Sequence, residues 1–350
     1  MKHKEGSRMS RTTLYALVLV CTFVGAIPVC ADNWPQWRGP DGDGVSRETD
    51  LPLVWTEESG IAWKCKLPGP GNSTPAIWGD AVFVTCQLDD GKLVLLRIDK
   101  SSGQMAWTRP VGVTSVPPPS QSSHRRRRTK FHDENNMASP TPATDGQTVV
   151  AHFGNGDLAA YDFDGKQLWH RNLQQDHGSY TIWWGHANSP VICDKLVISV
   201  CMQDSCRDLP GEPAPSYVVA HDLLSGEQRW KTMRMTDADA ERGDSYATPI
   251  LHRPSGRPEL VVIGGKVLDA YDPRDGRRLW HLPGLTGNRV IPSPVAVDGI
   301  IYANTGFYEG EALLAVKVAG LGERPHDDIV WRYEQGISDS PSPVVWGEQL

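Results

Sequence analysis

Short apolar runs alternate with polar turn residues along most of the chain. The runs are rich in Val, Ile, Thr and Tyr, and Gly, Asp and Pro separate them, a pattern that predicts β-strands joined by turns. No stretch keeps an apolar period of about 3.6 residues, so we expect helices to be minor. The clearest predicted strands span residues 81–85, 93–98, 148–153, 158–161, 196–200, 217–221, 260–265, 267–271 and 300–304.

These strands recur within a larger unit. Each unit starts at a Ser or Thr shortly before a proline, where we expect an innermost strand, and a turn and three further strands follow. Four strands of about six residues and four loops of about four give about 40 residues per unit. The longer units hold insertions at residues 114–135 and 205–215. The starting prolines are Pro75, Pro142, Pro190, Pro249, Pro294 and Pro343.

The outer end of each unit carries one sequence motif, which we call the phrase: an Asp followed by a Gly and then a Trp. The Asp can accept from the backbone N–H groups that follow it, and the Gly can adopt the positive φ of a tight turn. We expect each Trp to wedge between neighbouring units, where an indole buries about 200 Å². The phrases are Asp99, Gly103, Trp107; Asp162, Gly165, Trp169; Asp222, Gly226, Trp230; and Asp272, Gly276, Trp280, and Trp63 and Trp331 end two further segments. A repeat of four-stranded units predicts an all-β fold, a β-propeller of four-stranded blades.

Residues 160–162, 220–230 and 270–280 resemble the Ala-x-Asp-x-x-Thr-Gly-x-x-x-Trp repeat of pyrroloquinoline-quinone (PQQ) type propellers. The opening residues 33–40 and 43–45 are similar to the start of exported PQQ-like repeat proteins of planctomycete type. The resemblance implies a propeller related in fold to quinoprotein alcohol dehydrogenases and to the propeller lipoprotein of the outer-membrane assembly machinery. Since one repeat serves enzymes and non-catalytic propellers alike, the resemblance is more specific for fold than for chemistry.

The chain departs from this pattern near its end. Lys317 stands where the fifth repeat should have its Asp, and a longer link of residues 320–328 precedes Trp331. The resemblance implies seven or eight blades in an intact parent, whereas we count five complete repeats and the start of a sixth. We therefore expect an incomplete ring, in which residues 61–67 form an outer strand without partners and the exposed edges favour aggregation.

Residues 1–31 have the pattern of a secretory signal peptide, with a basic start, an apolar stretch and small residues before Asp32. We divide the rest into an N-terminal extension, residues 32–60, and the propeller, residues 61–350. Loss of the signal removes four of the 35 basic and one of the 42 acidic residues, leaving a net charge of −10. This charge argues against a nucleic-acid partner. The signal peptide predicts an exported protein of the periplasm or extracellular space, and no other segment has the ~20 apolar residues of a transmembrane span.

Five cysteines remain after the signal: Cys65, Cys86, Cys193, Cys201 and Cys206. An exported chain can oxidise its cysteines, but five cannot all pair within one molecule. Cys201 with Cys206 and Cys193 with Cys201 are the rival pairs, and the sequence does not choose between them.

The sequence lacks the common catalytic motifs. The sequence has no His-Glu-x-x-His, no Gly-x-Ser-x-Gly, no P-loop, no adjacent cysteine pair and no Cys-x-x-Cys-His. Residues 41–44 suggest a calcium loop, but Val45 and Pro52 occupy positions where an EF-hand needs ligands. We therefore expect no cofactor and no metal, with PQQ and calcium as the alternative.

Binding residues are predicted at the mouth of the central channel, in the loops that enter the innermost strands. Trp183 and Trp184 are suited to stack on a sugar or a peptide aromatic, and His132 and His186 are metal-ligand types, although such residues are also common in packed loops. The predicted mouth residues are His132, Asn135, Asn136, Trp183, Trp184, His186, Asn188, Tyr246, Arg289 and Asp339.

A basic run, Arg125 to Arg128, lies in the first insertion and is either a solvated loop or a contact for an anionic partner. Together these features favour an exported, non-catalytic propeller that binds a protein or polysaccharide partner at the cell envelope. The alternative is a PQQ- or metal-dependent oxidoreductase.

Overall fold

The computed structural model describes residues 32–49, 51–114, 135–182, 184–203, 216–306, 310–318 and 320–350, together with Met1. Residues 31–350 form one compact unit. The expected signal peptide, most of both insertions and the run Arg125 to Arg128 lie outside the described residues.

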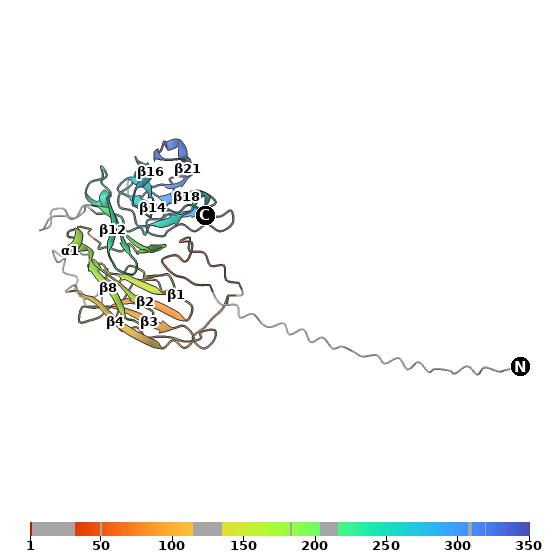
Figure 1. Ribbon diagram of the computed structural model, residues 1–350. Coiled ribbons are helices and arrows are strands. Elements are labelled where there is room, and N and C mark those ends of the chain that lie inside the picture. Colours follow the sequence, from red (N-terminus) through yellow and green to blue (C-terminus); the bar gives the residue numbers. More distant parts are fainter. Residues whose placement is uncertain are drawn as a thin grey trace. The chain divides into compact units, whose positions relative to one another are not determined.

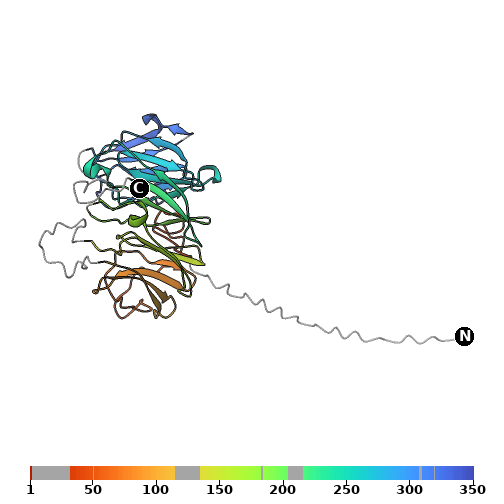
Figure 2. The ribbon, with the colours of Figure 1, turned by 60° about the vertical axis from the view of Figure 1, so that its left-hand side comes forward.

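Within this unit, five sheets, each built on four antiparallel strands, follow one another in chain order, shown from orange to blue in Figures 1 and 2. The first contains β1 (Ala76–Trp78), β2 (Ala81–Gln87), β3 (Lys92–Asp99) and β4 (Met105–Val113). The second contains β5 (Ala143–Thr144), β6 (Thr148–His152), β7 (Asp157–Asp162) and β8 (Gln167–Asn172). The third contains β9 (Val191–Cys193), β10 (Leu196–Cys201), β11 (Tyr217–Asp222) and β12 (Gln228–Met233).

The fourth sheet contains β13 (Ile250–His252), β14 (Glu259–Gly264), β15 (Val267–Tyr271) and β16 (Arg278–Leu282), and the fifth contains β17 (Val295–Val297), β18 (Ile300–Asn304), β19 (Leu313–Val316) and β21 (Ile329–Tyr333). The described helices are short: α1 (Leu173–His177), η2 (Ala240–Gly243), η3 (Pro254–Gly256) and η4 (His326–Asp328). The strands predicted within the repeats and the propeller-blade topology are confirmed. The expected outer strand at residues 61–67 is wrong, because this segment belongs to no strand of the structure. None of the helices in the described residues is long and apolar enough to cross a membrane.

Hydroxyl groups link the innermost strands of successive sheets. In every repeat, the Ser or Thr directly before the starting proline uses its backbone N–H to reach the hydroxyl of the equivalent residue in the next repeat. The five bonds run from Thr74 to Thr141, Thr141 to Ser189, Ser189 to Thr248, Thr248 to Ser293 and Ser293 to Ser342, each 3.0 Å long. The starting prolines therefore mark the positions where neighbouring blades are joined along their inner edges.

The tryptophans join the same sheets along their outer edges. The indole N–H of Trp169 donates to the carbonyl of Leu223, and that of Trp230 donates to the carbonyl of Pro273, in each case just after the Asp of the next repeat. Both rings are buried. A Cβ on Gly226 would lie 2.6 Å from the Trp169 ring, so this glycine is needed for ring packing as well as for its φ of 69°.

Trp63 and Trp107 make equivalent bonds to the carbonyls of Lys100 and Phe163 but are only half-buried. Trp331 differs from the expectation of a wedge, because it is 38% exposed and contacts only the ring of Tyr302 among the described aromatic groups. No described sheet follows β21 to cover this indole.

The register explains the alanine of the repeated phrase. Ala160 lies opposite Trp169, Ala220 opposite Trp230, and Ala270 opposite Trp280, each next to a β-bulge. A small residue facing the indole leaves room for the ring on the outer strand.

The seam between the fourth and fifth sheets uses other contacts. Trp280 is 1% exposed, yet its indole donates to the Glu259 carboxylate within its own sheet, at 2.8 Å. The long link before Trp331 also forms β20 (Gly322–Glu323), which adds to the fourth sheet by pairing in parallel with β16. The link therefore ties the fifth sheet to the outer edge of the fourth.

Candidate functional site

The predicted mouth residues separate by burial. Asn136, His186 and Asn188 are each at most 2% exposed and hold the loops to the blades. Asn136 accepts from the backbone N–H of Ala138, and Asn188 donates to the carbonyl of Ala247 at 2.6 Å. These side chains are fixed in the interior, so we assign them a structural role.

Four partly buried mouth residues lie together with Glu241 and form what we call the entry cluster: Asn135, Trp184, Glu241, Tyr246 and Arg289. Asn135 donates to the carbonyl of Trp184 at 2.6 Å, and the Trp184 N–H donates to the Tyr246 hydroxyl at 3.4 Å. Burial raises the pKa of Tyr246 well above its ordinary value, so the phenol stays protonated.

Charge within the entry cluster is centred on Arg289. Its guanidinium lies 5.6 Å from the centroid of the Trp184 ring, a cation–π distance, and 2.6 Å from Glu241. Asn288 also donates to Glu241, at 3.2 Å. Four separate entry loops thus hold one indole and one cation in fixed positions, an arrangement suited to contact a ligand through an aromatic face.

The other predicted mouth residues are not part of this cluster. His132 and Trp183 lie outside the described residues. Asp339 is half-buried, and no hydrogen bond or ion pair within the described part of the chain joins it to the entry cluster.

The sequence did not indicate a group of histidines between the second and third sheets, which we call the histidine seam: His152, His186 and His221. The rings of His152 and His186 are 4.5 Å apart, and His186 stacks on Tyr180 at 4.9 Å. Burial lowers the pKa of His186 to about 4 and that of His221 to about 4, and it lowers the pKa of His152 strongly. The three imidazoles are therefore neutral at pH 7.

A second feature that the sequence did not indicate lies at the other end of the inner strands. Residues 33–38 cross these strands: Trp34 pairs with Ile77, the Pro35 carbonyl accepts from Thr144, and the Trp37 indole donates to the Ser293 hydroxyl at 3.2 Å. The Arg38 guanidinium donates to the Pro343 carbonyl. The extension thus contacts sheets one, two and five and the start of the sixth repeat.

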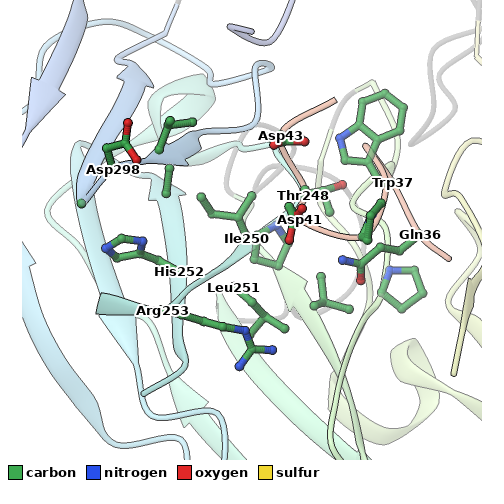
Figure 3. Close-up of a pocket in the computed structure, with 18 of the residues that line it drawn as sticks. Gln36, Trp37, Asp41, Asp43, Thr248, Ile250, Leu251, His252, Arg253 and Asp298 are labelled. Carbon is green, nitrogen blue, oxygen red and sulfur yellow. The ribbon is translucent and has the colours of Figure 1, made fainter. Parts of the chain in front are cut away.

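Between this segment and the inner strands of the third to fifth sheets lies a cavity of about 440 Å³, which we call the exit pocket (Figure 3). Val191, Ile250 and Val297 supply apolar lining, and Trp37 forms part of the wall. Polar side chains also line it: Gln36, Asp41, Asp43, His252, Arg253 and Asp298. The motif at residues 33–38 is the only sequence signal that could have located it.

The structure tests one of the two disulfide pairs that the sequence left open. Cys65, Cys86, Cys193 and Cys201 are free thiols, so the alternative pair Cys193–Cys201 is not formed, and Cys206 lies outside the described residues. Burial raises the pKa of Cys86 to about 11 and that of Cys193 to about 11, so both stay protonated. The described residues contain no group of three or more His, Cys, Asp or Glu placed to hold a metal ion.

PQQ binds together with calcium in quinoprotein dehydrogenases, so oxygen ligands are the relevant test of fit. At the entry mouth Glu241 is already bonded to Arg289 and Asn288. The entry cluster as described does not gather the set of carboxylates that calcium prefers.

The blade topology and the two chains of inter-blade bonds define a β-propeller protein. The PQQ_2 family, described as outer membrane protein assembly factor BamB, matches residues 45–210, a little under half of the chain. No curated protein sequence matches the chain.

Solved structures share the fold at low sequence identity. Quinohemoprotein alcohol dehydrogenase from Comamonas testosteroni is 14% identical with a TM-score of 0.57, and the match covers 89% of this chain and 51% of that one. A europium-containing methanol dehydrogenase is 12% identical with a TM-score of 0.50, covering 75% and 61%. BamB from Moraxella catarrhalis is 17% identical with a TM-score of 0.49, covering 82% and 70%. The chain thus spans about half the length of the alcohol dehydrogenase.

Proposed function

We propose that this protein is an exported, non-catalytic propeller of the cell envelope that binds a protein partner through its entry cluster. The observation that carries the proposal is the indole of Trp184, which is partly buried and lies against Arg289 in a cluster built by loops of four blades. Because aromatic and arginine side chains dominate the energetics of protein interfaces, a fixed pair of this kind favours a protein contact.

Pre-organisation supports the same proposal. Glu241 holds Arg289, and Asn135 holds the Trp184 main chain, so little side-chain entropy remains to be lost on binding. The match of residues 45–210 to the family of an outer membrane assembly factor also favours a protein partner at the envelope.

Site-specific crosslinking tests this function. A photo-crosslinking amino acid at position 184 in the full chain, expressed in host cells, should give discrete protease-sensitive adducts. The same amino acid at Lys195, an exposed position at the exit end of β9, is the matched control and should give none. Arg289→Glu should abolish the adducts at position 184, because it removes the fixed cation.

Two outcomes would contradict the proposal. Adducts that resist protease but are released by glycosidases would identify a polysaccharide as the partner. A quinone absorbance and dye-linked alcohol oxidation after addition of PQQ and calcium would favour the alternative, an oxidoreductase. The fold of the chain, shared with quinohemoprotein alcohol dehydrogenase, makes this second measurement necessary.

A further inference from the structure

The exit pocket is lined by three polar side chains that have no bonding partner within the described part of the chain. The side chains of His252, Arg253 and Asp298 make no hydrogen bond or ion pair within the described part of the chain, although all three line the cavity. Figure 3 shows them at one side of the pocket, on the ends of two neighbouring inner strands. Partial burial lowers the pKa of His252, so its imidazole is neutral at pH 7 and can both donate and accept.

The rest of the lining is apolar or already paired. Leu251 and Val297 contribute to one wall, and Trp37 contributes an aromatic surface whose orientation is fixed by its bond to Ser293. Asp41 is bound to Arg47 at 2.7 Å, so this carboxylate brings little uncompensated charge. The rim groups Arg253 and Asp298 are exposed and carry opposite charges. Asp43 accepts from the backbone N–H of Val45 and leaves the lining with a small net negative charge.

A ligand for this pocket must therefore be close to neutral, carry both donors and acceptors, and have an apolar face. The volume of about 440 Å³ lies within the range of small-molecule sites, about 300–1,000 Å³. A pyranose ring meets these conditions, because each hydroxyl both donates and accepts and its C–H face can pack on an indole. We propose that the exit pocket binds a neutral saccharide unit.

This site is separate from the one in the proposed function. The entry cluster lies before the inner strands begin, whereas the exit pocket is lined by Arg253 and Asp298, which follow β13 and β17. No residue of the entry cluster lines the exit pocket, so a saccharide in the pocket and a protein on the entry cluster would occupy different sites.

Titration of the full exported chain with neutral sugars tests the proposal. The probes are glucose, galactose, mannose, N-acetylglucosamine, maltose and cellobiose, followed by saturation-transfer NMR and calorimetry up to about 10 mM, a concentration that detects weak binding. We expect at least one sugar to bind. Asp298→Asn and Arg253→Gln should each weaken it about tenfold, the effect of losing one hydrogen bond to a charged group.

Asp194→Asn is the matched control. Asp194 occupies the turn after β9 with a φ of 53°, and Asp298 occupies the turn after β17 with a φ of 51°, but Asp194 does not line the pocket. Since Asn tolerates this backbone conformation, both variants should fold, and only Asp298→Asn should change affinity.

Three results would overturn the proposal: no binding of any probe, equal affinity in the control and the two pocket variants, or stronger binding of the zwitterionic dipeptide Ala-Ala than of any sugar. Crosslinking at Trp184 is independent of all three, so failure of the saccharide site and failure of the protein partner are distinguishable.

Discussion

Two neighbouring seams of the propeller bury a tryptophan with different partners. One lies between the third and fourth sheets, and the other lies between the fourth and fifth. In the first, Trp230 donates to a backbone carbonyl of the next blade, and Gly276 packs under its ring. In the second, Lys317 replaces the Asp of the phrase, and Trp280 donates instead to Glu259 in its own sheet. The link that forms β20 supplies the contact between sheets.

The difference shows what the repeat must conserve physically. Each seam has to bury an indole and provide an acceptor for its N–H, because a buried donor without a partner costs about 1–3 kcal/mol. The identity of the acceptor is free to change. A repeat can therefore lose its Asp and still close its seam, provided that another segment covers the edge.

Removal of one buried tryptophan should have the largest effect on the free energy of unfolding. Trp230→Ala should lower the free energy of unfolding by about 3–5 kcal/mol, since it leaves a cavity between two blades. Trp331→Ala, at an indole that is 38% exposed, should cost about 1 kcal/mol or less. Urea unfolding of both variants measures the difference, and equal losses would mean that burial between blades is not what stabilises the seams.

Acidification should act on the histidine seam between the second and third sheets. Below a pH of about 6.5 the unfolded chain binds protons that the folded imidazoles do not take up until about pH 4, so stability falls as the pH drops through this window. Each such histidine should contribute about 2 kcal/mol of loss between pH 7 and 5.

His152→Phe tests this pH dependence, because the ring lies at 0% exposure and has no well-formed hydrogen bond within the described residues. The variant should recover about 2 kcal/mol of the acid-induced loss in urea unfolding at pH 5. His326→Gln, at an exposed position, should recover none. An unchanged pH profile in His152→Phe would rule out His152 as a source of acid sensitivity.

The smallest expected effect concerns the substituted acceptor of the last seam. Glu259→Ala should cost about 1–2 kcal/mol, because the buried indole N–H of Trp280 loses its partner. Glu259→Gln keeps an acceptor oxygen and should recover most of the loss. Thermal or urea unfolding distinguishes the two variants, and an equal loss in both would show that the carboxylate acts by its charge alone.

The strands were predictable because each is a local pattern of β-branched and apolar residues bounded by turn residues. β10 and β11, for example, follow directly from runs at residues 196–200 and 217–221. The pairing of β20 with β16 was not predictable, since it joins segments about 40 residues apart through only two residue pairs and carries no strand pattern of its own.

The candidate sites show the same limit. Trp184 and Arg289 could be assigned to one face because both precede the inner strand of a blade. The exit pocket depends on residues 36–47 lying against strands more than 140 residues later, which no local pattern encodes. His152 could not be predicted as part of the histidine seam for another reason. It ends an apolar strand run, and its role depends on the facing ring of His186.

The hydroxyl links along the inner edge have a consequence for how such a chain can change in length. Each repeat contributes one backbone donor and one hydroxyl acceptor, so every blade is equivalent to every other in this respect. Duplication or loss of an entire blade would leave every remaining donor matched to an acceptor, whereas a partial insertion would break the series. The inner edge therefore tolerates gain or loss only in whole units.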